Sequence, residues 1–328
     1  MKIKIISISE DNINNIEEFL SSLNCNYKSN EPLSNHTTLC IGGNADYFVE
    51  VETEQQLISL LKFINENNIK FFVIGGGSNL LFGDDGFRGI VIKLSLHSNS
   101  EFAKIGNEEK IDSYDGDIQN SDNSTTSIYC GGAVSLAYLA IKTAEHGLSG
   151  LEYLSAIPGT VGGAVFGNAG VRNCSMSDVV DKIEIIDYSG NKRVLVRKDI
   201  NFEYRKSNLK DVIITKIFFI LKNADKNDIL KTISQERKRR ITSQPIGTKN
   251  AGCVFKNPES DSAGRLIDSL NLKNYSVGGI KISDVHANFF VNENNGCAQD
   301  MIKLIDFVKD EVCKKYNIKL ETEIKIIK

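Results

Sequence analysis

The N-terminal part of the chain alternates between helix-like and strand-like hydrophobic patterns. Aliphatic residues recur at helical spacing over about 11–24, which predicts an amphipathic helix. Strand-like DYFVEV follows at 46–51, and FFVI follows at 71–74. Between these two segments, one face of a predicted helix carries Leu57, Leu60, Leu61 and Ile64. The order strand, helix, strand predicts a β-α-β unit behind an accessory helix.

The same patterns continue along the chain, with one change of character. A predicted helix at 134–146 ends before Gly147, a residue type that often stops helices. Strands are expected at 90–94, 127–130, 182–188, 192–197 and 212–221. A charged helix over 225–240 marks a boundary near 223–228, after which turns rich in glycine appear. Beyond it we expect a helix at 262–271, a strand at 284–292, a helix at 298–315 and a strand at 318–327.

Residues 98–126 interrupt this pattern. The segment is rich in Asn, Asp, Ser, Glu and Gly and poor in apolar residues, so it buries too little surface to order itself. We expect a flexible insertion between two strands. A partner site is the alternative that its acidic character leaves open.

Composition excludes several classes of protein. A chain of 328 residues with 41% apolar content is a globular protein with more than one hydrophobic core. Its net charge of −3 provides no general attraction to nucleic acid or to an anionic membrane. No secretory signal and no apolar run long enough to span a bilayer is evident, so a cytoplasmic location is expected. The sequence indicates no obligatory protein partner.

Cysteine and histidine are present without the spacing of a metal site. The seven cysteines are odd in number and lack CxxC pairs, and the four histidines are dispersed. Neither a disulfide framework nor a bound metal is expected. Each cysteine is ordinarily interpreted as a small, buried apolar residue of a protein in a reducing compartment.

Two glycine-rich stretches carry the first chemical signal. GGGSN at 75–79 follows an apolar strand, and glycines allow backbone N–H groups to approach an anion closely. Alone it is a weak signal, because it lacks the spacing of GxGxxG and the end of a P-loop, and a tight turn explains it equally well. A second stretch, SAIPGTVGGAVFGNAG at 155–170, changes the interpretation. Two such loops in one domain can bind both phosphates of a dinucleotide.

Five ordered motifs resemble a known family. GGGSNLL at 75–81, GLSGLEYLSAIPGTVGGAVFGNAG at 147–170, FEYRKSNL at 202–209, AGCVFKNP at 251–258 and LETEI at 320–324 are similar in order and spacing to UDP-N-acetylenolpyruvoylglucosamine reductases. The resemblance covers roughly residues 30–328. It implies an α+β protein with an FAD-binding domain of the vanillyl-alcohol-oxidase (PCMH) type, built from two α/β subdomains, and a smaller α+β substrate-binding domain.

The resemblance also implies an activity and a domain plan. NADPH would reduce the bound FAD, and a hydride would then pass to the enolpyruvyl group of UDP-N-acetylglucosamine enolpyruvate, giving UDP-N-acetylmuramate for peptidoglycan precursors. The expected parts are an N-terminal helical extension at 1–29, the FAD-binding domain at 30–223, the substrate-binding domain at 224–317 and a C-terminal strand at 318–328.

Site residues follow by matching the motifs. Hydride addition to the enolpyruvyl ether requires a proton donor for the neighbouring carbon and a cation for the carboxylate. The family places serine or cysteine as the donor, and Cys253 occupies that position. Arg205 matches its catalytic arginine, whose guanidinium fork suits a carboxylate. Glu323 matches its catalytic carboxylate and should share a face of the strand with Glu321 and Lys325.

Binding residues are implied in the same way. Tyr204, Asn257 and Lys325 fall where the family contacts substrate, and a cation from the run Arg237–Arg240, Arg240 in particular, would meet the UDP diphosphate. The expected FAD contacts are Gly75, Gly76, Gly77, Ser78, Asn79, Pro158, Gly159, Thr160, Gly162, Gly163, Asn168 and Gly170. Each catalytic position also has an ordinary alternative. Arg205 would be a surface arginine, Cys253 a buried structural cysteine, and Glu323 part of a strand face that is merely solvated.

The chain departs from the family pattern at two places and leaves two other functions open. Cys40 stands before Ile41-Gly42-Gly43 where the family often has arginine, and Val171-Arg172-Asn173 follows Gly170 in place of Tyr-Gly. The short connection after Arg205 resembles the family type without an extra substrate loop. The alternatives are an FAD-dependent oxidase of alcohols or hydroxy acids, and a non-catalytic nucleotide-sugar-binding or flavin-binding protein.

Overall fold

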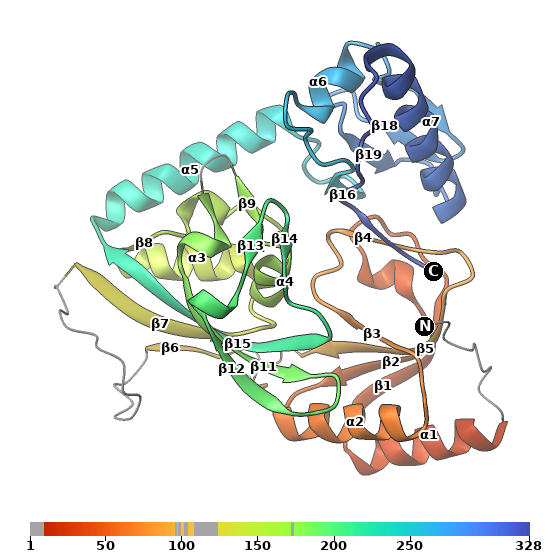
Figure 1. Ribbon diagram of the computed structural model, residues 1–328, viewed down its shortest axis with the longest axis vertical. Helices are drawn as coiled ribbons and strands as arrows, with labels where there is room; N and C mark the ends of the chain where they lie inside the picture. Colours follow the sequence, from red (N-terminus) through yellow and green to blue (C-terminus); the bar gives the residue numbers. More distant parts are fainter. Residues whose placement is uncertain (1–9, 96, 98–99, 102–103, 108–123, 172–173) are drawn as a thin grey trace.

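The computed structural model describes residues 10–95, 97, 100–101, 104–107, 124–171 and 174–328, with side chains from residue 16 onward. Three blocks of secondary structure follow one another along the chain (Figure 1). Most of the expected insertion at 98–126 lies outside the described residues. The α+β class is confirmed by the mixture of helices with parallel and antiparallel sheets.

The first block is a four-stranded sheet of order β1-β2-β5-β3, covered by two helices. The β-α-β unit expected from the sequence is confirmed, because β2 and β3 both pair in parallel with β5. Aliphatic residues of α2 pack against β5, as the helical spacing predicted. The elements are β1 (Asn26–Pro32), β2 (Asn44–Val51), β3 (Phe71–Ile74), β5 (Phe87–Leu94), α1 (Glu10–Ser22) and α2 (Glu54–Glu66).

The second block is an antiparallel sheet of order β12-β11-β15-β7-β6, with β8 also paired to β15. Its long central strand, β15, supplies the continuous apolar pattern seen at 212–221. Its core also holds residues of α3 and α4. The elements are β6 (Ile105–Asn107), β7 (Thr125–Gly131), β8 (Leu148–Ser149), β11 (Val180–Asp187), β12 (Lys192–Val196), β15 (Val212–Asn223), α3 (Leu136–Glu145) and α4 (Val161–Phe166).

The third block is a four-stranded antiparallel sheet of order β16-β19-β18-β17 packed against α6 and α7. Helix α5 leads into it and buries Ile229 and Ile233 beside Ala144 of the second block. In Figure 1 this helix spans from the second block to the third. The elements are α5 (Lys226–Ser243), β16 (Asn250–Cys253), α6 (Ala263–Asp268), β17 (Ser276–Val277), β18 (Ile280–Ile282), β19 (Phe289–Asn292) and α7 (Ala298–Tyr316).

Short elements complete the chain. The strand pairs β9 (Gly170–Val171) with β10 (Cys174–Ser175), and β13 (Phe202–Glu203) with β14 (Lys206–Ser207), are two-residue ladders. Strand β20 (Lys325–Ile327) pairs in parallel with β4 (Leu80–Phe82) and so returns the C-terminus to the first block (Figure 1). The 3₁₀ helices are Leu33–His36, Glu152–Leu154, Met176–Asp178 and Arg197–Asp199.

Three expected elements differ in extent. The strand expected at 284–292 begins only at Phe289, because the Ser283 hydroxyl accepts hydrogen bonds from the N–H groups of Val285 and His286 and closes a turn. The strand expected at 318–327 is a strand only from Lys325, and its earlier part bridges to the segment after β16. The region 1–29 is not helical throughout, since β1 begins at Asn26 and joins the first sheet.

Asp84 ties the first block to the third. It lies between β4 and β5, and its carboxylate accepts hydrogen bonds from the N–H groups of Ala298 (2.7 Å) and Gln299 (3.0 Å) at the start of α7. A carboxylate at a helix N-terminus accepts hydrogen bonds from the free N–H groups, and its negative charge interacts favourably with the helix dipole. We expect Asp84→Ala to lower the free energy of unfolding by about 1 kcal/mol, measured by urea titration.

The neighbouring residue provides the control for this prediction. Within the described residues, the Asp85 side chain makes no hydrogen bond or ion pair with the protein. Asp85→Ala should therefore leave the urea midpoint where it is. Equal shifts for the two variants would contradict the capping role of Asp84.

Candidate active site

The two glycine-rich loops lie in contact. The Ser78 hydroxyl donates a hydrogen bond to the Pro158 carbonyl (3.0 Å). A Cβ placed on Gly76 would come 2.7 Å from Gly159 Cα, closer than atoms approach without something shifting. Gly159 itself has a φ of +117°, a conformation that side chains disfavour. Glycine is thus required on both loops for their close approach.

Backbone N–H groups at this junction are available to an anion. Within the described part of the chain, the N–H groups of Gly76, Gly77, Ser78, Gly159 and Thr160 donate no hydrogen bond to the protein. The Ser155 hydroxyl, at the start of the second loop, is buried and has no partner there. Such groups are normally satisfied by a ligand or water. The donors fit the diphosphate of FAD, which these two loops were expected to hold.

Other residues of the second loop support its shape. Thr160 caps α4 by accepting a hydrogen bond from the Gly163 N–H (3.2 Å). The Gly162 N–H donates to the Gly132 carbonyl, and a Cβ at Gly162 would lie 2.9 Å from that oxygen. A Cβ at Gly170 would meet the Cys174 carbonyl at 2.7 Å. Close packing within the protein accounts for the last two glycines.

Asn79 and Asn168 use their side chains within the protein. Asn79 Nδ2 donates to the Glu323 carbonyl (3.2 Å), and its own carbonyl accepts from the Lys325 N–H (3.1 Å). Asn79 of the first glycine loop therefore fixes the backbone at Glu323, just before β20, and at Lys325, where β20 begins. Asn168 Nδ2 donates to the Glu203 carbonyl, while its Oδ1 accepts from the Ser177 N–H. Asn168 supports the hairpin that carries Arg205.

Arg205 projects from the tip of the β13–β14 hairpin. Its φ is +56°, a left-handed conformation that costs a residue with a Cβ on the order of 1 kcal/mol. The guanidinium lies 5.1 Å from the Tyr204 ring centroid, and its Nε lies 2.9 Å from Glu323 Oε1. Only residues 208–211 separate β14 from β15, as the short connection in the sequence implied.

Cys253 ends β16 at an irregular point of the sheet. Asn250 pairs with Val291 and Cys253 with Phe289, so β16 holds one residue more than β19 over this stretch. Gly252, with a φ of +75°, accommodates this bulge. Burial raises the pKa of the Cys253 thiol to about 12, and the negative charge of Glu323 adds to the effect. The thiol is therefore protonated at neutral pH.

Glu323 lies between the glycine loop and the segment after Cys253. Its N–H donates to the Val254 carbonyl (2.8 Å), opposite the bond from Asn79 to its own carbonyl. Burial raises the pKa of its carboxyl, and the guanidinium of Arg205 opposes that rise. The backbone of Glu323 is thus held by hydrogen bonds on two sides, and its carboxyl group faces the Arg205 guanidinium.

Two further cations lie at this centre. Arg240, on α5, donates from Nη1 to the Ala156 carbonyl (2.6 Å) beside the second glycine loop. Burial lowers the pKa of Arg240, which also interacts electrostatically with Cys253 and Arg205. The Lys325 ammonium lies 4.2 Å from the Phe166 ring centroid, and burial of this ammonium lowers its pKa, although the lysine as a whole is exposed. Arg237 and Lys238, by contrast, are solvent-exposed.

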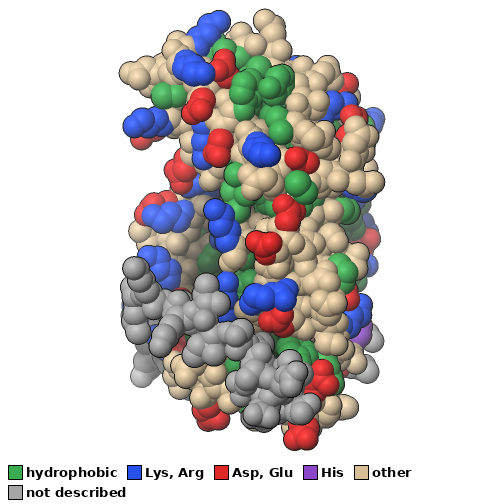
Figure 2. Space-filling view, turned by 90° about the vertical axis from the view of Figure 1, so that its right-hand side faces the viewer, with side chains coloured by type: hydrophobic (Ala, Val, Ile, Leu, Met, Phe, Trp, Pro, Cys, Tyr) green, Lys and Arg blue, Asp and Glu red, His purple; other side chains and the backbone are tan. Residues whose placement is uncertain are grey.

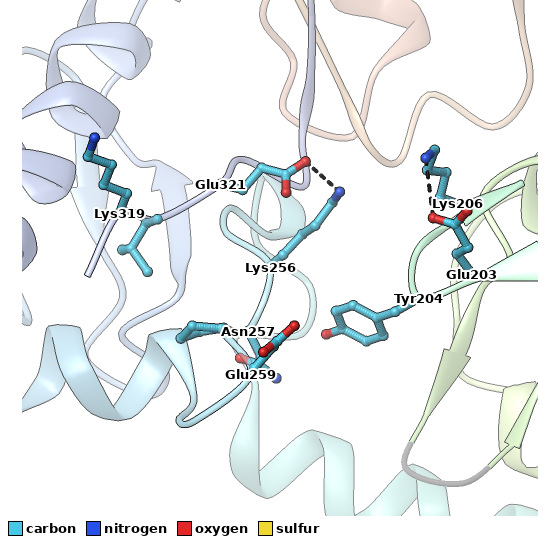
Figure 3. Close-up of a pocket in the computed structure, with 10 residues that line it drawn as sticks. Glu203, Tyr204, Lys206, Lys256, Asn257, Glu259, Lys319 and Glu321 are labelled. Carbon is cyan, nitrogen blue, oxygen red and sulfur yellow. Dashed lines mark hydrogen bonds and ion pairs between the residues drawn. The ribbon is translucent and has the colours of Figure 1, made fainter.

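Two adjoining cavities open beside these residues. The smaller, of about 260 Å³, is lined by Arg205 and by Glu321, Glu323 and Lys325, among others. The last three are the residues that were expected on one face of the C-terminal strand, and they border the same cavity. The larger, of about 490 Å³, is lined by Tyr204, Asn257 and three lysines: Lys206, Lys256 and Lys319. Figure 3 shows the Tyr204 ring pointing across this cavity toward Asn257 and Glu259.

Two ion pairs line the larger cavity. Lys256 Nζ lies 2.6 Å from Glu321 Oε1, and Lys206 Nζ lies 3.2 Å from Glu203 Oε2 (Figure 3). Asn257 Oδ1 accepts from the Ala263 N–H, which fixes the loop before α6. Figure 2 shows Lys and Arg side chains around a hollow at mid-height, and charges of both signs elsewhere on that face. Lys256 and Glu321 belong to motifs AGCVFKNP and LETEI, which was the available signal.

The departures from the family pattern are only partly described. Cys40 is exposed and has a φ of +53°, and it precedes Gly42, which packs against Leu33 and Phe82. Val171 lies in β9, whereas Arg172 and Asn173 lie outside the described residues. Among the described residues, no group of three or more His, Cys, Asp or Glu is arranged to hold a metal ion. None of their helices is both long and apolar enough to cross a membrane.

Two family models match separate parts of this chain. The model of an FAD binding domain matches residues 45–195, and the model of the UDP-N-acetylenolpyruvoylglucosamine reductase C-terminal domain matches residues 244–327. The UDP-N-acetylenolpyruvoylglucosamine reductase of Carboxydothermus hydrogenoformans is 36% identical over 313 residues, which cover 95% of this chain and 97% of that protein. That of Bacillus subtilis is 36% identical over 302 residues, covering 91% and 93%.

A solved structure extends the similarity to three dimensions. The crystal structure of UDP-N-acetylenolpyruvylglucosamine reductase from Thermus caldophilus superposes with a TM-score of 0.74 at 33% identity, covering 93% of this chain and 99% of that one. Identity of this order over nearly the whole length of both chains shows common ancestry and fold. The chain belongs to the UDP-N-acetylenolpyruvoylglucosamine reductase family.

Proposed function

We propose that this chain reduces UDP-N-acetylenolpyruvoylglucosamine to UDP-N-acetylmuramate with FAD and NADPH, as a step of peptidoglycan precursor synthesis. Membership of the family supports this function. The observation that carries it is the meeting of Arg205, Cys253 and Glu323, from three distant segments, beside two loops with free N–H groups.

The three side chains suit the parts of this reaction. FAD, when bound by the glycine loops, supplies the hydride that it has taken from NADPH. Arg205 offers a guanidinium to the substrate carboxylate, where negative charge grows as the hydride adds to the methylene carbon. The Cys253 thiol gives its proton to the adjacent carbon. Glu323 orients the Arg205 guanidinium through its contact with Nε.

Binding roles are proposed for the residues around the two cavities. Tyr204 and Asn257 border the larger cavity, and Lys325 borders the smaller one. Arg240 is partly buried and interacts electrostatically with Cys253 and Arg205, whereas Arg237 and Lys238 are exposed. We therefore assign Arg240 to the anionic centre of the substrate, including the diphosphate next to it. The glycine loops, with Ser78 and Thr160, are assigned to FAD.

Two alternatives have less support. An FAD-dependent oxidase of alcohols or hydroxy acids would share the glycine loops but has no use for a protonated thiol paired with an arginine and a carboxylate. A non-catalytic nucleotide-sugar-binding protein has no reason to bring these three reactive groups together. The domain limits, at 30–223 for FAD binding and 224–317 for substrate binding, are part of the proposal, with Glu323 supplied by the C-terminal segment.

An anaerobic stopped-flow experiment tests the proposed function. The purified protein should be yellow, NADPH should bleach its flavin absorbance, and the enolpyruvyl sugar nucleotide should restore the colour. Stoichiometric appearance of UDP-N-acetylmuramate would complete the demonstration. Absence of flavin, or restoration of the colour by oxygen at a rate matching that with substrate, would overturn the proposal in favour of one of the alternatives.

The cellular setting is proposed on chemical grounds. The seven cysteines, all within the described residues, are free thiols, which suits a reducing compartment such as the cytoplasm. Peptidoglycan precursors carrying UDP also require the cytoplasmic nucleotide pool. No protein, nucleic acid or membrane partner is needed for the reaction as proposed.

A further inference from the structure

Asn288 is a buried polar residue that the reaction does not use directly. It directly precedes β19, and only 1% of its surface is exposed. Its side-chain Oδ1 accepts from the Phe255 N–H (3.0 Å), and its Nδ2 donates to the Phe255 carbonyl (2.8 Å). Its own carbonyl accepts from the Val254 N–H (2.8 Å). Asn288 therefore binds the two residues that follow Cys253 by three hydrogen bonds.

The segment that Asn288 holds follows the thiol directly and pairs with the segment that carries the Glu323 carboxylate. On the opposite side of this segment, the Val254 carbonyl accepts from the Glu323 N–H (2.8 Å), and Phe255 bridges to Thr322. The segment 253–255 is thus fixed between Asn288 and the residues around Glu323. A bulge immediately before it removes the regular ladder that would otherwise set its direction.

The Asn288 amide also reaches the thiol itself. Its interaction with the Cys253 side chain opposes the rise in the thiol pKa that burial and Glu323 cause. The charged groups around the thiol are Glu323, Arg205 and Arg240, each of which comes from another element. Asn288 is uncharged, and it directly precedes β19, the strand that pairs with β16.

We propose that Asn288 is a positioning residue for proton transfer, which aims the Cys253 thiol at the substrate carbon and fixes its distance from Glu323. In a regular β-ladder the pleat alone would set the direction of the Cys253 side chain. The bulge before Cys253 breaks the ladder, so the direction depends on the next place where the backbone is held by hydrogen bonds. The Asn288 side chain supplies that point. The proposal rests on the role of Cys253 in the proposed function.

A second buried asparagine provides a matched control. Asn292 ends the same strand and is 4% exposed. Its Nδ2 donates to the Leu39 carbonyl (3.0 Å), and its Oδ1 accepts from the Gly296 N–H (2.7 Å). It therefore resembles Asn288 in burial and in the number of side-chain hydrogen bonds, but it contacts neither Cys253 nor the segment after it. Loss of either residue should destabilise the fold.

The experiment compares Asn288→Ala with Asn292→Ala in the flavin-loaded protein. We expect Asn288→Ala to slow recovery of the flavin colour by substrate roughly 10–100-fold while NADPH bleaches it at the normal rate. The solvent deuterium isotope effect on the recovery should rise. Alkylation of Cys253 by iodoacetamide, followed by mass spectrometry, should shift to higher pH. Asn292→Ala should leave all three readouts within about threefold of the original.

Other outcomes separate the proposal from its premise. If Asn288→Ala and Asn292→Ala slow recovery equally, or if neither does while Cys253→Ala is crippled, Asn288 does not position the thiol but the proposed function stands. If Cys253→Ala itself is unimpaired, the proposed donor is wrong and the inference falls with it. Should Asn288→Ala fail to fold, Asn288→Asp keeps the size and the acceptor for Phe255 N–H but loses the donors, and the same slowing is expected.

Discussion

Cys253→Ala is expected to reduce the rate at which the enolpyruvyl substrate restores the flavin colour by at least about 1,000-fold, with bleaching by NADPH unchanged. The substitution removes the group that donates the proton to the carbon next to the hydride-accepting carbon. Because the first half of the reaction requires no proton from Cys253, stopped-flow measurement of the two halves separates the effects.

Serine at position 253 provides the informative comparison. Its hydroxyl donates a proton in the same place, so Cys253→Ser should retain far more activity than Cys253→Ala. Cys174→Ala is the matched control, since Cys174 is a partly buried thiol whose pKa burial raises to about 11, away from Arg205 and Glu323. If Cys174→Ala were as slow as Cys253→Ala, the role of Cys253 as donor would be refuted.

The thiol pKa also predicts a pH dependence. A donor whose pKa is raised to about 12 stays in its acid form as pH rises, and it loses its proton only near that value. The rate of colour recovery should therefore show no fall attributable to Cys253 between pH 7 and about pH 10. A fall centred near the ordinary thiol pKa of about 8.5 would show that the thiol is not held as the structure indicates.

The fold was largely predictable because the spacing of hydrophobic residues and the positions of glycines determine most of its helices, strands and turns. The β-α-β unit with Leu57 and Leu60 and the long strand at 212–221 required only a count of apolar spacing. Strand ends were predicted less well, because hydrogen bonds decide them. The Ser283 hydroxyl turns the chain before Phe289, and the segment before Lys325 pairs with a bulged strand that no local pattern reveals.

The residues of the site were predictable from the sequence, but the contacts between them were not. Motif similarity pointed to Arg205, Cys253 and Glu323, which lie far apart in the sequence. It gave no sign that Arg240 would turn from its charged run toward Cys253, or that Asn79 of the glycine loop would hold the Glu323 backbone. These contacts depend on how the three blocks pack, and Asn288 had only the weak signal of a polar residue among apolar neighbours.

Arg205→Ala is expected to slow colour recovery by substrate by about 1,000-fold, and Arg205→Lys by about 10–100-fold. Alanine removes the cation that faces the substrate carboxylate. Lysine keeps a charge but loses the planar fork and the Nε contact to Glu323 (2.9 Å). NADPH should bleach the flavin in both variants. The left-handed backbone at position 205 is disfavoured for each replacement as it is for arginine, so the difference between them reports on the head group.

The pH profile distinguishes this role from a merely structural one. Burial raises the pKa of Glu323, and Arg205 holds it down, so removing the guanidinium lets that pKa rise further. Glu323 then takes up a proton at higher pH, and the acid limb of the recovery rate should move upward in Arg205→Ala. Arg193→Ala is the control, since Arg193 is an exposed arginine on β12 that pairs with Asp187 (3.8 Å) and lines neither cavity. An unchanged acid limb in Arg205→Ala, or a loss of rate in Arg193→Ala of the same size, would mean that the Arg205–Glu323 pair does not act on the reacting group.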